Sequence, residues 1–80
     1  MKTIFNTYIE IESQEQADRL KQVCIDNELD CWPSEDTFVL DENYKHFGCY
    51  KGYFDIWNLS IGNTQVTETE WLQLLKEYKS

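Results

Sequence analysis

Apolar and polar positions alternate with a period of two along residues 3–12, which predicts a β-strand with one buried face. Phe5, Thr7, Ile9 and Ile11 fall on one side of this strand, and Ile4 falls on the other side with mostly polar neighbours. The first side is therefore expected to face a hydrophobic core.

A helical spacing of apolar residues follows directly. Ser13 and Gln16 fit a capping box, in which a hydroxyl and an amide side chain each satisfy one free backbone N–H at the helix start. The pattern predicts a helix that continues to about residue 28, with its polar residues outside. The inward positions of this helix are Ala17, Leu20, Val23 and Cys24.

A second helix is predicted near the C-terminal end of the sequence. Thr67 and Glu70 form another capping box, and Val66 and Trp71 have the spacing of a hydrophobic staple across the helix start. The apolar stripe of this helix is Trp71, Leu74, Leu75 and Tyr78, at positions i, i+3, i+4 and i+7.

The middle of the chain has β-forming residues. The clearest signal is a hairpin, because the strand-like segments 44–50 and 53–59 flank Lys51-Gly52, where glycine supplies the positive φ of a tight turn. The other expected elements are a short strand at 29–32, a strand at 37–40 and a turn at 60–65.

The element order β-α-β-β-β-α predicts an α+β fold for residues 1–80, a single small domain with an antiparallel sheet and both helices on one face. A ferredoxin-like variant and a helix-backed meander are the two topologies considered. In either arrangement one face of the sheet has no helical cover.

Charge narrows the classes of function. The 80 residues include 15 Asp and Glu but only 7 Lys and Arg, which gives a net charge of −8. Proteins that bind the phosphate backbone of nucleic acid do so with clustered cations. Direct binding to nucleic acid is therefore not expected. No apolar run approaches a membrane span and no secretory signal is recognised, so no membrane contact and a cytoplasmic location are expected.

The chemistry-bearing residues do not form a catalytic or metal pattern. Cys24, Cys31 and Cys49 are an odd number and are read as reduced thiols. His46 and Cys49 are three residues apart, which would place them on opposite faces of a strand, and the cysteine spacings do not favour zinc. No catalytic, metal or cofactor residues are assigned, and a non-enzymatic protein is expected.

Acidic residues are concentrated in one part of the sequence, since eleven of the fifteen lie in residues 10–42 with only Arg19 and Lys21 as cations. One interpretation is solubility alone. The other is a negative surface that steers the protein toward a basic partner, with carboxylates standing in for phosphates.

Aromatic residues are concentrated in residues 44–57, where six of fourteen positions are Tyr, Phe or Trp. With Phe47, Phe54 and Ile56 in the core, the remaining aromatic side chains would fall on the uncovered face. Tyr and Trp are enriched at binding hot spots. Cross-strand packing that only stabilises the sheet is the alternative.

The aromatic segment Tyr50-Lys51-Gly52-Tyr53-Phe54-Asp55-Ile56-Trp57 and the capped helix that starts at Val66-Thr67-Glu68-Thr69-Glu70-Trp71 resemble those of very small acidic bacteriophage or mobile-element proteins. The resemblance covers roughly the last 35 residues. It implies a protein that acts by binding a host or rival protein, in the host cytoplasm, as inhibitors of nucleases and defence systems do. It assigns no functional residue.

The leading hypothesis is an acidic inhibitor or modulator that docks on a basic, nucleic-acid-handling surface of a protein partner. A small-ligand binding or sequestering protein is the alternative, and a homodimer through the aromatic face is also considered. The candidate partner-binding residues are Glu28, Asp30, Trp32, Glu35, Asp36, Asp41, Glu42, Tyr44, Tyr50, Tyr53 and Trp57.

Overall fold

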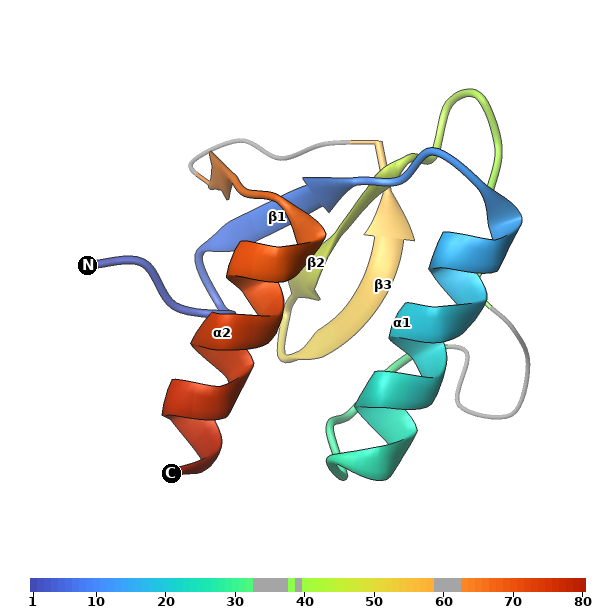
Figure 1. Cartoon of the computed structure of the whole chain (residues 1–80). Coiled ribbons are helices and arrows are strands. Elements are labelled where there is room, and N and C mark those ends of the chain that lie inside the picture. The colour runs from blue at the N-terminus through green and yellow to red at the C-terminus, as the bar shows by residue number, and fades with distance from the viewer. Residues whose placement is uncertain (33–37, 39, 59–62) are drawn as a thin grey trace.

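The computed structural model describes residues 1–32, 38, 40–58 and 63–80. Two helices pack against a four-stranded sheet (Figure 1). In chain order the elements are β1 (Thr7–Glu10), α1 (Gln14–Asp26), β2 (His46–Tyr50), β3 (Tyr53–Trp57), β4 (Thr64–Gln65) and α2 (Glu68–Lys79).

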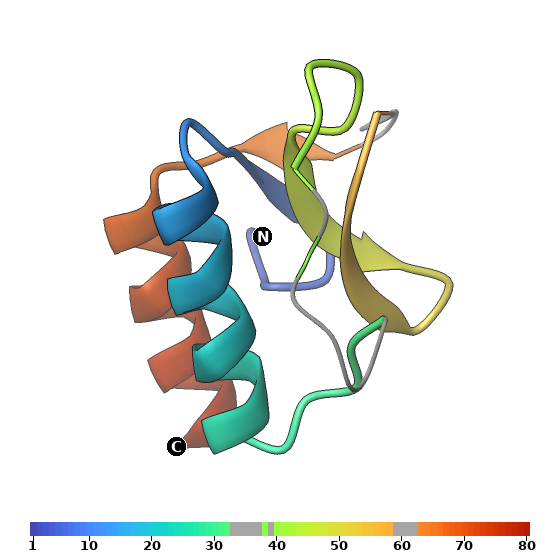
Figure 2. The same ribbon diagram turned by 90° about the vertical axis from the view of Figure 1, so that its right-hand side faces the viewer.

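The strand order is β3-β2-β1-β4, and both helices lie on one side of the sheet (Figure 2). The pairs β1/β2 and β2/β3 are antiparallel, whereas β4 runs parallel to β1. The α+β class and the helix-covered face are therefore confirmed. The sheet is mixed rather than wholly antiparallel, and its three consecutive antiparallel strands follow the meander rather than the ferredoxin-like plait.

The strand β4 corrects the expectation of a turn at 60–65. The backbone N–H of Thr64 donates to the Asn6 carbonyl at 3.0 Å, and that of Val66 donates to the Tyr8 carbonyl at 2.8 Å. This pairing joins residues nearly sixty positions apart, which no local turn signal in the sequence can anticipate. Residues 60–62 lie outside the described residues.

The two weaker strand expectations have different outcomes. In segment 29–32 only Cys31 forms an isolated bridge, to Phe54. In segment 37–40, Thr37 and residue 39 lie outside the described residues, and neither Phe38 nor Leu40 is in a strand. Phe38 is nevertheless fully buried, so this segment contributes to the core.

The N-terminal alternation is correct for Thr7, Ile9 and Ile11, which are all buried, but it is reversed for the residues before them. Ile4 is fully buried and Phe5 is 45% exposed. The reason is a turn in which the Asn6 side chain accepts a hydrogen bond from the Thr3 N–H at 2.7 Å. This local hydrogen bond interrupts the period of two before β1 begins.

Both helix starts are confirmed. The Ser13 hydroxyl accepts the Gln16 N–H at 3.1 Å, and the Thr67 hydroxyl accepts the Glu70 N–H at 3.1 Å. The helix α1 ends at Asp26, and Glu28 then takes a left-handed φ of 57°. No helix among the described residues is long and apolar enough to span a membrane.

The hairpin is confirmed, with shorter strands than expected. Tyr50 pairs with Tyr53, so the loop consists of Lys51 and Gly52, whose φ values are 55° and 93°. Two successive positive φ values are those of a type I′ turn, whose twist matches that of the flanking strands. The turn sets the register of β2 against β3 and therefore decides which side chains share a face.

Candidate functional site

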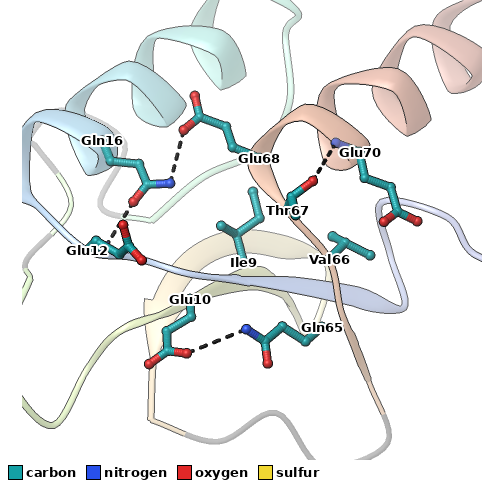
Figure 3. Close-up of a pocket in the computed structure, with 9 residues that line it drawn as sticks. All are labelled: Ile9, Glu10, Glu12, Gln16, Gln65, Val66, Thr67, Glu68 and Glu70. Carbon is teal, nitrogen blue, oxygen red and sulfur yellow. Dashed lines mark hydrogen bonds between the residues drawn. The ribbon is translucent and has the colours of Figure 1, made fainter.

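The sheet has one face that no helix covers. Along β1 and β3, partly or fully exposed side chains alternate with buried ones, and Figure 3 shows Ile9 on the helix side of β1 with Glu10 on the other side. We refer to the uncovered side as the open face. It is formed by Tyr8, Glu10, His46, Tyr50, Tyr53, Asp55, Trp57 and Gln65.

A glycine at the centre of the open face leaves space for a neighbouring ring. Gly48 pairs with Tyr8 on one side and with Asp55 on the other. The Tyr50 hydroxyl donates to the His46 carbonyl at 2.9 Å, so its ring spans Gly48 on the same strand. A Cβ atom at Gly48 would lie 3.1 Å from the Thr7 carbonyl oxygen, a tight contact that favours glycine at this position, and 3.8 Å from the Tyr50 hydroxyl, which is an ordinary van der Waals contact.

The predicted aromatic residues gather along β3. Tyr50, Tyr53 and Trp57 are on the open face, as the expected register required. Tyr44 extends the face at one end, because its ring lies 5.3 Å from that of Trp57, and Trp32 extends it at the other, 6.5 Å from Tyr53.

Trp32 and Asp30 are held at this edge by the backbone. The Phe54 N–H donates to the Asp30 carbonyl at 2.9 Å, and the Trp32 N–H donates to the Phe54 carbonyl at 2.9 Å. Trp32 is 61% exposed and Trp57 is 45% exposed, so large aromatic surfaces reach solvent at both ends of β3. Exposed tryptophan in this density is a feature of binding surfaces.

The predicted acidic residues are only partly brought together. Asp41 and Glu42 lie in the turn before β2, where the Asp41 carboxylate accepts the Asn43 N–H at 3.0 Å, and Glu42 is exposed. Asp30 lies at the other end of β3. Glu28 follows α1 and belongs to the helix layer. Glu35 and Asp36 lie outside the described residues.

Five residues of the open face were not among the candidate partner-binding residues: Tyr8, Glu10, His46, Asp55 and Gln65. The Tyr8 and His46 rings lie 4.7 Å apart at a tilt of 46°, and 35 residues separate β1 from β2, so no local pattern places these rings together. Asp55 could have been found, because it alternates with the core residues Phe54 and Ile56 in the hairpin. Burial raises the pKa of its carboxyl, and the Ile56 N–H and the charge of Lys21 lower it less strongly.

A second feature is an open acidic depression of about 540 Å³ between β1, β4 and the starts of the two helices (Figure 3). Its glutamates are mostly engaged within the chain. Glu68 pairs with Arg19 at 3.1 Å and accepts the Gln16 amide at 3.0 Å, and Glu70 pairs with Lys2 at 2.8 Å. These contacts tie α2 to α1 and to the N-terminal segment, so we interpret the depression as a structural junction rather than as the binding site.

The sulfur and imidazole groups do not converge. Cys24 is fully buried on α1. The backbones of Cys31 and Cys49 form β-pairings with Phe54 from its two opposite sides, and His46 lies on the open face. All three cysteines are free thiols. Among the described residues, no group of three histidine, cysteine or acidic side chains could hold a metal ion.

Cys24 should make stability fall at alkaline pH. Burial raises the pKa of its thiol from 9.0 to about 12, so above pH 9 the unfolded chain loses this proton before the folded chain does. The stabilisation is complete below pH 9 and declines as the pH rises toward 12, by up to about 1 kcal/mol per pH unit. Urea denaturation between pH 8 and about 10.5 should show a steeper decline for the wild type than for Cys24→Ala. Parallel declines would contradict this assignment.

The fold and the site together define a small α+β domain with one helix-covered sheet face and an opposite face that is rich in aromatic and acidic side chains. No family model, curated protein or solved structure matches this chain.

Proposed function

We propose that this chain is a non-enzymatic acidic binding protein, of the phage inhibitor or modulator type, that docks through its open face on a basic surface of a protein partner. The observation that carries the proposal is the open face itself, where the exposed Trp57 and half-buried Tyr rings adjoin carboxylates on the sheet. A basic surface that normally handles nucleic acid has the complementary charge.

Two physical properties favour a protein partner over other occupants. Tyr and Trp offer large contact areas at low conformational cost, and they dominate interface hot spots. The eight residues of the open face include Glu10 and Asp55 but neither lysine nor arginine, whereas aromatic platforms for single-stranded nucleic acid lie beside positive grooves. Two copies joined face to face would oppose their own carboxylates, which disfavours a homodimer through this surface.

The first experiment is affinity capture from bacterial lysate, including lysate with phage-defence systems expressed, with washes at low and high salt. The expected result is a basic, nucleic-acid-handling protein that is released by high salt. If no protein is retained at either salt, the proposal fails and the small-ligand alternative gains support, which a ligand-induced rise in Tm would test.

Charge reversal at the ends of β3 should slow association with that partner. Asp30→Lys with Glu42→Lys is expected to reduce the association rate at low salt by roughly tenfold and to flatten its salt dependence, because electrostatic steering acts on encounter. Surface plasmon resonance at several salt concentrations measures both effects.

The matched control is Glu15→Lys with Glu77→Lys, which makes the same change in net charge at exposed positions of the helices. Equal slowing by both pairs would mean that net charge acts without regard to place, and the docking orientation would be wrong.

A further inference from the structure

The open face has a carboxylate at the middle of β3, that of Asp55. Asp55 is half-buried, and its Oδ1 atom accepts the Ile56 N–H at 2.7 Å. Among the described residues no other hydrogen bond to this carboxylate is found, so the Oδ2 atom is available to a ligand. Burial of an ionised carboxyl costs stability unless a cation compensates it.

Aromatic rings surround this carboxylate. Tyr53 and Trp57 are two positions away on β3 and therefore flank Asp55 on the same face, about 7 Å along the strand in each direction. Opposite Asp55 lies Gly48, which has no side chain, and the Tyr50 ring spans that position. Asp55 thus lies between aromatic side chains on the open face.

The charges around Asp55 are unbalanced on the solvent side. Lys21 is the cation whose charge lowers the pKa of Asp55, but Lys21 is buried on α1 with its ammonium 4.8 Å from the centre of the Phe38 ring. It therefore acts from the helix side of the sheet. On the solvent side, the open face presents no lysine or arginine among its defining residues.

We propose that the part of the open face around Asp55 binds an arginine side chain of the protein partner, with its guanidinium paired to Asp55 and stacked against the neighbouring aromatic rings. This inference rests on the proposed function and specifies the partner's anchor residue. A guanidinium is planar, stacks on aromatic faces and donates two parallel hydrogen bonds to a carboxylate. A lysine ammonium is a compact, strongly hydrated charge that gains less from stacking.

A second copy of this chain is a poor source of that arginine. Arg19 is the only arginine in the sequence, and it is paired with Glu68 at 3.1 Å on the helix side. The occupant is therefore a different protein that presents an exposed arginine within a basic surface.

The test needs no identified partner. The ¹⁵N-labelled protein is titrated with N-acetyl-arginine amide and, separately, with N-acetyl-lysine amide, at equal ionic strength. The arginine probe is expected to cause saturable shifts of the Ile56 amide and of the Trp57 indole N–H, with weak affinity and at least about threefold preference over the lysine probe.

The variant Asp55→Asn keeps an oxygen that accepts the Ile56 N–H but removes the charge. It should bind the arginine probe roughly tenfold more weakly or not at all, whereas the matched neutralisation Glu77→Gln should bind as the wild type does. The proposal is overturned if Asp55→Asn binds the arginine probe as well as the wild type, or if the lysine probe binds equally well.

The outcomes separate this inference from the proposed function. If a basic protein is captured in a salt-sensitive way but the arginine titration fails, the proposed docking through the open face is supported and the proposed arginine binding is contradicted. Success of the titration with no captured partner supports arginine binding at Asp55 and contradicts the proposed class of partner.

Discussion

Replacing Trp71 with alanine is expected to lower the free energy of unfolding by about 3–5 kcal/mol, a large fraction of the stability of a domain of this size. Trp71 is the largest fully buried side chain in the described structure, and its ring meets those of Phe47 at 5.2 Å and Phe54 at 5.9 Å in edge-to-face contacts. Its Nε1 atom is buried without a hydrogen-bond partner among the described residues, so packing rather than hydrogen bonding accounts for the effect.

Urea denaturation followed by circular dichroism measures this change. The control is Leu72→Ala, the adjacent position on α2, where the side chain is 37% exposed and the expected loss is below about 1 kcal/mol. Equal losses for the two variants would show that helix propensity, not the aromatic core, dominates the contribution of α2.

Replacing Trp57 with alanine should weaken binding to the captured partner by about 2–4 kcal/mol, or roughly 30-fold to 1000-fold in Kd. Trp57 is 45% exposed at the end of β3, where it packs against Tyr44, so a partner can cover it further. Because it lies outside the buried core, the change in Tm should be small. Calorimetric titration gives the affinity, and thermal denaturation gives the stability.

Tyr78→Ala is the matched control for aromatic exposure. Tyr78 is 54% exposed and packs on Phe5 at 5.1 Å, in the helix layer away from the open face. Its removal should leave the affinity unchanged. A larger loss of affinity for Tyr78→Ala than for Trp57→Ala would place the interface on the helix side instead.

The parts of the fold that sequence predicts well are those specified within a few residues. The Ser13 and Thr67 caps and the Lys51-Gly52 turn depend on one side chain or one positive φ, and each is found where the pattern places it. The pairing of β4 with β1 depends on contacts between distant parts of the chain, so the same local rules predicted a turn there. Ile4 is buried and Phe5 is exposed, the reverse of what the alternation predicts, because the Asn6 side chain accepts a hydrogen bond in the turn before β1. The spacing of apolar residues alone does not predict such a bond.

The candidate site likewise combines residues that local sequence signals predict and residues whose place depends on contacts between distant parts of the chain. Tyr50, Tyr53 and Trp57 are predictable because the hairpin sets their parity against Phe54 and Ile56. The contribution of Tyr8 and the space above Gly48 require the neighbouring strand β1, whose register no turn specifies. The sequence prediction weighted acidic residues by their density, whereas Asp55, the carboxylate in the middle of β3, lies outside that dense region.

The position of α2 has a consequence for synthesis of the chain. Phe47 and Phe54 are synthesised well before Trp71, the third ring of their cluster. The second edge of β1 likewise stays unpaired until β4 has been synthesised. A nascent chain on the ribosome therefore carries an incomplete aromatic cluster and an unpaired strand until the region up to Lys79 has emerged from the exit tunnel. Folding of this domain is therefore expected to be complete only after α2 has emerged, and chains that terminate before α2 should be substrates for chaperones and proteases.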